Sequence, residues 1–410
     1  MLLTGFFKTM THLIADKIKQ YVAAQHHGYS LAQAFYKDID VYQTEIHKIF
    51  LQHWLYAGHE SQLAKTGDYF TFEFDTESVI LIRTTTGEVK AHMNVCRHRG
   101  SKICLEAAGS QKSLTCPYHA WNYNLDGELI AARNMPADFD LAQHGLHKVN
   151  VAVLHGLIFV CLSENPPSLS ALQNELSEVF ELFGTSSMKL AEKKSYPIAA
   201  NWKLAVENYQ ECYHCAPSHP EFAQIHAMAK APKVFKSAKA NFALANLGNP
   251  KFKQLNRYFD LAEAGQEGYQ YDRNPLLRGA LSGGEGGKPV APFLGTIEKY
   301  DGGASELMIG PLSYFLIYDD HMLAYRFLPI SVDECICEVS WLVNASAVAG
   351  QDYQLEQLTW LWDVTTQADK KIIMNNQKGV DSRFYQPGPL SDMESFQQSF
   401  LNWYLQALVK

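Results

Sequence analysis

The chain contains C-R-H-R-G-S at residues 96–101 and C-P-Y-H-A-W at residues 116–121, so a cysteine and a histidine stand close together twice. Each pair is expected where a strand passes into a loop. A structural zinc site with two cysteines and two histidines usually has a pair of cysteines followed by a pair of histidines. The mixed halves fit better a [2Fe–2S] cluster in which two cysteines bind one iron and two histidines bind the other. The spacing therefore favours an iron–sulfur cluster over zinc.

These stretches, the second extended to C-P-Y-H-A-W-N-Y, resemble the Rieske motif of the Rieske non-haem iron oxygenases. The resemblance implies that Cys96 and Cys116 bind one iron and that His98 and His119 bind the other. Neutral imidazoles lower the negative charge of such a cluster, which raises its reduction potential above that of a four-cysteine cluster.

A second group of candidate ligands lies in N-Y-Q-E-C-Y-H-C-A-P-S-H at residues 208–219. His214 and His219 would be about 140° apart around a continuous helix, so the helix must stop between them if both bind one metal. We predict that Pro217 ends the helix and that Pro220 keeps His219 extended. Two histidines and one carboxylate form the facial triad of non-haem Fe(II) oxygenases, which leaves positions open for O₂ and substrate.

The carboxylate of this triad has two candidates. Glu211 shares a helix face with His214. Asp369, in T-T-Q-A-D-K-K-I-I-M-N-N at residues 365–376, shares the inward face of its helix with apolar residues that follow it, whereas Asp363 does not share that stripe. In the resembling family the ligand is an aspartate far downstream, which implies Asp369.

The resemblance gives Glu211 a different role. In this family a head-to-tail trimer brings the Rieske domain of one chain beside the iron of the next, and an acid joins the two sites. Carried over, Glu211 would hydrogen-bond His214 in its own chain and His119 in the neighbouring chain. Asn208 would lie close behind the iron ligands. On the residues alone, the favoured interpretation of Glu211 is an ordinary solvated helix glutamate.

The remaining cysteines are predicted to be packing residues. Cys212 and Cys215 flank His214, but a facial triad needs only nitrogen and oxygen ligands. Cys335 and Cys337 alternate along a predicted strand and share a buried face. Eight cysteines in 410 residues do not indicate a disulfide framework, so we expect a reducing cytoplasm.

The resemblance extends over nearly the whole chain. It includes H-W-L-Y-A-G-H (53–59), N-W-K-L-A-V-E-N-Y (201–209) and Y-Q-P-G-P-L-S-D-M-E (385–394), which are similar to the α subunits of glycine betaine, stachydrine, carnitine and choline monooxygenases. It implies a terminal oxygenase that hydroxylates an N-methyl group of a quaternary ammonium compound and releases formaldehyde. Electrons would come from NAD(P)H through a separate flavin and iron–sulfur reductase.

Other activities stay open at this stage. Choline-type oxidation would give an aldehyde without formaldehyde, carnitine is an alternative substrate, and the same apparatus can dihydroxylate an aromatic ring. A simple electron carrier would need only the first motif, and a structural zinc protein would be colourless. Aromatic faces suit a trimethylammonium group, and the candidates near the predicted site are Tyr209, Tyr213, Phe315, Tyr318 and Tyr325. Phe315 and Tyr318 have opposite parity on one strand, so both cannot face one regular pocket.

The pattern along the chain predicts an α+β fold with two domains. Short β-type runs at 69–74, 79–83, 89–95 and 156–162 indicate a small all-β Rieske domain over residues 51–165. Helices are predicted at 169–183, 201–213, 355–362, 366–376 and 394–408, and β runs at 312–318, 323–328 and 336–342. Residues 166–410, with the helical residues 1–50, are predicted to form a catalytic domain of helix-grip type, an antiparallel sheet flanked by helices.

Composition excludes several classes of function. A formal charge of −8 with 19% charged residues disfavours nucleic acid as the main partner. No apolar run reaches the roughly 20 residues needed to span a bilayer, and the first ten residues are too short and interrupted for a secretory signal. The stretch S-G-G-E-G-G-K at 282–288 lacks the glycine spacing of a phosphate loop, so we predict a flexible surface loop there.

Overall fold

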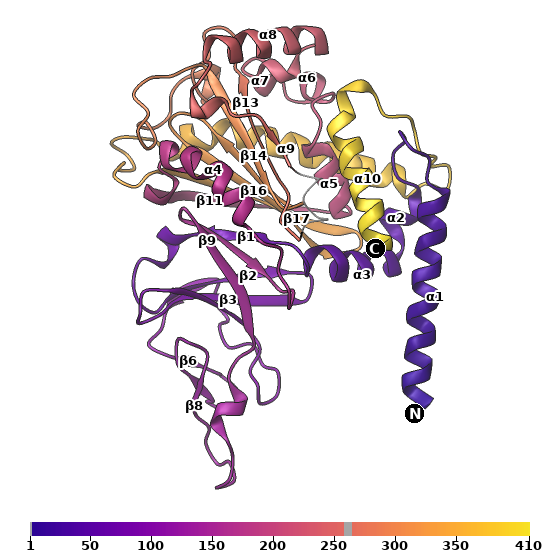
Figure 1. Cartoon of the computed structure of the whole chain (residues 1–410), viewed down its shortest axis with the longest axis vertical. Helices are drawn as coiled ribbons and strands as arrows, with labels where there is room; N and C mark the ends of the chain where they lie inside the picture. Colours follow the sequence, from indigo (N-terminus) through magenta and orange to yellow (C-terminus); the bar gives the residue numbers. More distant parts are fainter. Residues whose placement is uncertain (1, 258–264) are drawn as a thin grey trace.

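The computed structural model describes residues 2–257 and 265–410, with side chains from residue 12 onward. It divides into a β-rich lower part and a larger upper part built on a second sheet (Figure 1). This is the predicted α+β fold, an all-β domain followed by an antiparallel sheet flanked by helices. Within the described residues, no helix combines the length and the apolar content that crossing a bilayer requires.

The β-rich part contains a seven-stranded and a three-stranded sheet. The larger sheet has the order β1-β10-β9-β4-β3-β2-β5, and every pair is antiparallel. Its strands are β1 (Leu55–His59), β2 (Asp68–Phe74), β3 (Glu77–Arg83), β4 (Val89–Met93), β5 (Ala108–Ser110), β9 (Lys148–Leu154) and β10 (Leu157–Cys161). The small sheet holds β6 (Leu114–Thr115), β7 (Asn122–Tyr123) and β8 (Leu129–Ala131), which lie near the far end of this domain.

The catalytic part is built on a second antiparallel seven-stranded sheet in the order β11-β17-β16-β15-β14-β13-β12. Its strands are β11 (Met188–Ile198), β12 (Leu255–Asn256), β13 (Tyr269–Pro275), β14 (Gly303–Ile309), β15 (Ser313–Ile317), β16 (Met322–Ser331) and β17 (Glu334–Asn344). Helices α5 (Trp202–Tyr209) and α9 (Leu355–Val380) cover one face, and α4 (Ser170–Phe183) packs on the other. The remaining helices are α1 (Leu2–Ala24), α2 (Gln33–Lys37), α3 (Ile39–Glu45), α6 (Cys215–Ser218), α7 (Pro220–Ala223), α8 (Pro232–Ala245) and α10 (Ser395–Val409).

Alternation along β15 separates the two faces of this sheet. Tyr314 and Leu316 join the core under α5 and α9, whereas Phe315 and Ile317 join the core shared with α4 and the β-rich part. Tyr318 lies just past the strand on the α5 side. The predicted opposite parity of Phe315 and Tyr318 is thus confirmed.

The N-terminal helices pack against the catalytic part, and α1 lies beside α10 (Figure 1). A completely buried ion pair joins α3 to α5, with Nζ of Lys203 2.7 Å from Oε1 of Glu45. The Tyr36 hydroxyl, from α2, donates to Glu207 of α5 at 3.0 Å. Removing one partner of a buried ion pair costs about 3–5 kcal/mol, so these contacts fix α5 firmly.

Three sequence predictions are wrong in detail. The helix predicted over 201–213 ends at Tyr209, and the two helices predicted over 355–376 are one helix, α9. The predicted surface loop at 282–288 is exposed at Glu285, Gly286 and Lys288, but its first part is packed, because the Ser282 hydroxyl donates to Asp320 at 2.5 Å and both residues are fully buried. A Cβ on Gly283 would lie 2.7 Å from the Tyr318 ring, so only glycine fits there.

Candidate metal centres

Two loops of the β-rich domain have the same backbone design. In each loop the cysteine N–H donates to the carbonyl of the residue five positions later in the sequence. The N–H of the residue four positions later donates back to the cysteine carbonyl. The bonds are Cys96 to Ser101 (2.9 Å) and Gly100 to Cys96 (2.9 Å) in one loop, and Cys116 to Trp121 (2.8 Å) and Ala120 to Cys116 (3.0 Å) in the other. The fourth residue has positive φ in both, +78° at Gly100 and +57° at Ala120. The two loops therefore present their cysteines and histidines alike.

The four predicted cluster ligands come together at the tips of these loops. Cys96 and Cys116 are buried at 3% and 2% exposure, and the proximity of Cys116 contributes to a raised pKa of Cys96, for which burial is the main cause. Nδ1 of His98 lies 3.1 Å from Nδ1 of His119. Two buried sulfurs and two converging ring nitrogens match the donor set of a Rieske cluster. The side chain of His119 is exposed.

The second site begins where α5 ends. The Glu211 carboxylate accepts hydrogen bonds from the backbone N–H groups of Tyr213 and His214, the latter at 3.3 Å. Such side-chain bonds compete with helical backbone bonds, so the chain leaves the helix at Gln210 and forms a tight turn. Glu211 and His214 therefore meet across a turn and not on a helix face as predicted.

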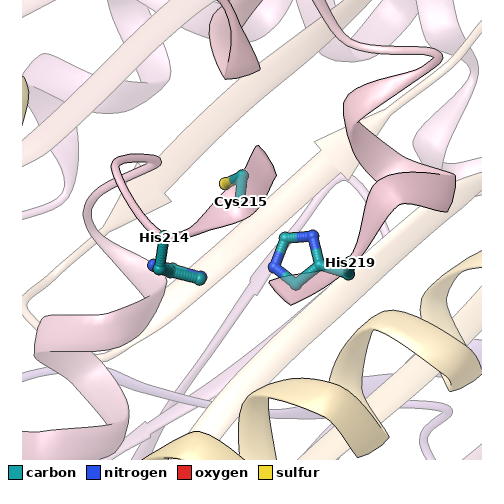
Figure 2. Close-up of side chains that lie close together, drawn as sticks. All are labelled: His214, Cys215 and His219. Carbon is teal, nitrogen blue, oxygen red and sulfur yellow. The ribbon is translucent and has the colours of Figure 1, made fainter. Parts of the chain in front are cut away.

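Only one of the two prolines acts as predicted. Pro217 lies in the first turn of α6, where its missing N–H costs nothing, so it does not end a helix. Pro220 begins α7, and His219 before it has φ −144° and ψ 83°, outside the helical region as predicted. The result is that His214 and His219 flank α6 and turn their rings toward each other, 5.2 Å apart and at 81° (Figure 2).

Asp369 of α9 completes the group. Its Oδ1 lies 3.3 Å from Nε2 of His214 and 3.1 Å from Nε2 of His219. Oδ1 of Asp369 and both ring nitrogens of His219 are buried without a well-aligned hydrogen bond. Three ligand atoms that converge at short distance without satisfying one another fit a divalent cation of the facial-triad kind.

The charges at this site support the same reading. Burial opposes a charge on His214, but the adjacent carboxylates of Asp369 and Glu211 outweigh it and raise the pKa of His214 to about 9. Burial also opposes ionisation of Asp369, yet the two histidines hold its pKa below the usual value. The site thus favours one positive charge at its centre, which a metal ion supplies when the imidazoles are neutral.

Comparison with known proteins decides the family. Residues 53–150 match the family described as Rieske [2Fe-2S] domain, and residues 185–409 match the family described as ring hydroxylating alpha subunit, catalytic domain. The glycine betaine monooxygenase oxygenase subunit of Pseudomonas aeruginosa is 34% identical over 94% of this chain and 90% of that protein. The chain belongs to the Rieske non-haem iron oxygenases, as an α subunit.

Two further likenesses are partial or structural. The carnitine monooxygenase oxygenase subunit of Escherichia coli K12 is 34% identical over 52% of this chain and 59% of that protein. A solved quaternary ammonium Rieske monooxygenase superposes with a TM-score of 0.72 at 22% identity, covering 95% of this chain and 96% of that one. This Rieske oxygenase is therefore an oxidoreductase of the monooxygenase type that uses a [2Fe–2S] cluster and a mononuclear iron.

The cysteines beside His214 correct the sequence analysis. Cys212 and Cys215 form a disulfide, so the prediction that they only fill space is wrong. Figure 2 shows Cys215 beside the two histidines, and its sulfur lies within 4.8 Å of a nitrogen of each ring. A disulfide sulfur is not a thiolate and does not compete with Asp369 for a metal. Cys335 and Cys337 are core residues, as predicted.

The aromatic candidates divide into two groups. Tyr209 lies 5.3 Å from Tyr325, ring centre to ring centre, at the end of α5, and Tyr318 lies on the same side of the sheet. Phe315 packs on the opposite face against Tyr56, with ring centres 5.1 Å apart, so its predicted place in the substrate site is wrong. Tyr213 is 59% exposed at the surface and does not line an enclosed site in this chain.

Sequence reasoning missed two polar residues on the iron side of the sheet. His226 is buried against the Tyr318 hydroxyl at 2.6 Å, and burial lowers its pKa to about 4. Glu306 lies within the otherwise uncharged strand G-A-S-E-L-M-I. The sequence signal for Glu306 was a single charged residue within an otherwise uncharged and largely apolar strand. The signal for His226 was its position four residues after Phe222, which would place the two rings on one helical face. Asn208, which was predicted, has its Nδ2 3.3 Å from Nε2 of His214.

Proposed function

We propose that this Rieske oxygenase removes one methyl group from a quaternary ammonium compound of the glycine betaine type. The observation that carries the proposal is the likeness to a glycine betaine monooxygenase oxygenase subunit over 94% of the chain. The N-methyl carbon is hydroxylated, and the resulting carbinolamine collapses to formaldehyde and a tertiary amine. One O₂, two electrons and two protons give one water and one formaldehyde, with one proton released from the product.

The metal groups are proposed to bind the residues that the sequence suggested. Cys96, Cys116, His98 and His119 would hold the cluster, and His214, His219 and Asp369 would hold the iron. When bound, these groups supply one-electron storage and the activation of O₂. The protein's own residues orient the ligands: the Glu211 carboxylate accepts from the His214 ring, and Asn208 approaches its other side.

Electrons are proposed to cross between chains of a head-to-tail homotrimer. His119 is exposed on one chain, and Glu211 lies beside His214 on the other. A hydrogen bond from His119 of the neighbouring chain to Glu211 would connect the two centres. A separate NAD(P)H-dependent reductase with flavin and an iron–sulfur centre would supply the electrons.

The test is product analysis with a reconstituted reductase. We expect formaldehyde and dimethylglycine to appear in equal amounts from glycine betaine, with one O₂ consumed for each. Carnitine and choline are the comparison substrates, and choline-type oxidation would give an aldehyde without loss of a methyl group. Turnover of none of these quaternary amines by fully loaded enzyme would refute the proposal.

Aromatic dihydroxylation is the second candidate, because the matching catalytic family is described by ring hydroxylation. It predicts a cis-diol from an aromatic acid and no formaldehyde. A competition assay with glycine betaine and benzoate in one reaction separates the two activities, since the products differ in kind.

A further inference from the structure

Glu306 is placed unlike any other acid of the catalytic sheet. It is partly buried, whereas the other six residues of β14 are buried. Its register neighbour Leu316 on β15 belongs to the core under α5 and α9, and so do Ala304 and Met308 on its own strand. The Glu306 side chain therefore points to the face of the sheet on which the iron ligands lie.

This carboxylate has no partner among the residues that the structure describes: no hydrogen bond or ion pair reaches it. Three other acids of this domain are paired: Asp319 contacts Arg273 at 2.8 Å, Asp272 pairs with Lys239, and Glu338 pairs with Arg326. An enclosed charge without a partner is costly. A partly buried carboxylate without a protein partner is a candidate for binding a positively charged ligand group.

Aromatic side chains surround the same region. Tyr314 and Tyr318 lie two residues before and after Leu316, the register neighbour of Glu306, and belong to the same core. Besides burial, the Glu306 charge contributes to raising the pKa of both Tyr209 and Tyr318. The Tyr209 ring contacts Tyr314 at 4.6 Å and Tyr325 at 5.3 Å, measured between ring centres. Tyr209 also keeps part of its surface accessible, unlike most of α5.

One negative charge beside aromatic faces is the arrangement that recognises a cation without N–H groups. A quaternary ammonium group cannot donate an ordinary N–H hydrogen bond, so it is held by charge and by the faces of aromatic rings. We propose that Glu306 is the counter-ion of the substrate's ammonium group and makes this site select an ammonium group over an uncharged group of the same shape. The inference rests on the proposed function and assigns its specificity to one residue.

The protonation of Glu306 gives an independent readout. Burial raises the pKa of Glu306 to about 7, Asp272 adds to the rise, and Lys239 opposes it. Tyr209 and Tyr318 are neutral near pH 7, because the ordinary pKa of tyrosine is about 10 and burial raises the pKa of each further. A cation should therefore bind more tightly as pH rises through about 7, when Glu306 becomes a carboxylate. A ligand with an uncharged tert-butyl group in place of the ammonium group should show no such increase.

The experiment compares glycine betaine with 3,3-dimethylbutyrate, in which carbon replaces the ammonium nitrogen, by calorimetric titration of the iron-loaded enzyme. Wild type is expected to bind glycine betaine at least tenfold more tightly. Glu306→Gln should lose about tenfold to a hundredfold in betaine affinity, with binding of the carbon analogue unchanged and the pH dependence removed. Glu306→Asp keeps the charge and should retain part of the preference.

Glu207→Gln is the matched control. Burial raises the pKa of Glu207 to about 7 as well, but its carboxylate accepts from the Tyr36 hydroxyl at 3.0 Å on the other side of α5. This variant should keep the preference for glycine betaine and its pH dependence.

The possible failures are distinguishable. Wild type that binds neither glycine betaine nor another quaternary amine would overturn the proposed function. Wild type that prefers the cation, with the same preference in Glu306→Gln, would overturn only the role of Glu306. The wild-type pH profile needs no variant, so a flat profile for glycine betaine between pH 6 and 8 would also overturn that role.

Discussion

Oε1 of Glu211 lies 2.5 Å from Nδ1 of His214, on the opposite edge of the ring from the Nε2 atom that approaches Asp369. The two acids thus contact different nitrogens of one imidazole. Only Asp369 also approaches Nε2 of His219. This geometry favours Asp369 as the metal ligand and leaves Glu211 to hold the outer N–H of a metal-bound histidine.

Replacing Glu211 by Gln is expected to slow electron transfer while both metal sites stay loaded. The amide can still accept one hydrogen bond, but it loses the charge and one of the two acceptor oxygens needed to bridge two rings. We expect oxidation of the reduced cluster in a single turnover to slow at least tenfold, as measured by stopped-flow absorption. Glu221→Gln, on nearby α7, is the control and should behave as wild type. An unchanged rate in Glu211→Gln would contradict the bridge.

Replacing Asp369 by Asn is expected to release the mononuclear iron and spare the cluster. Removing the carboxylate leaves two neutral imidazoles, a weak site for Fe(II). Iron content should fall from three to two per chain, with the absorption and EPR of the cluster unchanged. Asp363→Asn is the control, because Asp363 bonds Tyr196 at 2.6 Å and Lys194 at 2.9 Å. If Asp363→Asn lost iron and Asp369→Asn did not, the assignment of Asp369 as the iron ligand would be wrong.

The sequence was sufficient for features that depend on periodicity. Strand alternation placed Phe315 and Tyr318 on opposite faces, and helical periodicity separated Asp369 from Asp363 although the prediction broke α9 in two. Mixed Cys–His spacing indicated the cluster donors because the two loops are short and local.

Features that depend on side-chain bonds across turns could not be predicted. The helix predicted over 201–213 ends early because the Glu211 carboxylate accepts hydrogen bonds from two backbone N–H groups. Helix propensities of single residues do not describe such bonds. The partner of Cys212 is set by the turn between it and Cys215. Glu306 was missed because its face of the sheet is defined by α5 and α9, which are distant in the sequence.

The disulfide beside the iron site should not be required for metal binding. The three converging ligand atoms are nitrogen and oxygen, so replacing both Cys212 and Cys215 by Ala removes no ligand. We expect the double variant to keep three irons per chain by elemental analysis. The single variant Cys212→Ala frees a thiol within 4.8 Å of both imidazoles and should bind softer metals such as Zn²⁺ or Co²⁺ more readily. If the double variant lost its mononuclear iron, a cysteine sulfur would have to be one of the metal ligands.

Arg326 and Glu338 form one of the links between the two domains, and this link should weaken at acid pH. Nη1 of Arg326 donates to the carbonyls of Tyr56 at 3.0 Å and Ala57 at 2.6 Å in the Rieske domain. Burial opposes the charge on Glu338, but the attraction of Arg326 outweighs it and lowers the pKa of Glu338 from 4.5 to about 2. This stability is present above pH 4.5 and is lost as the pH falls toward 2.

Glu338→Gln is accordingly expected to lower the free energy of unfolding at pH 7 by roughly 3 kcal/mol, the equivalent of that pKa change. The difference from wild type should be roughly half as large at pH 3, because much of the wild-type contribution is already lost there. Urea denaturation followed by circular dichroism at both pH values measures it, taking the first transition if the two domains unfold separately. Glu334→Gln, exposed on the same strand, should have no effect at either pH. An equal loss of stability at pH 3 and pH 7 would mean that packing, and not the charge of Glu338, holds Arg326 against the Rieske domain.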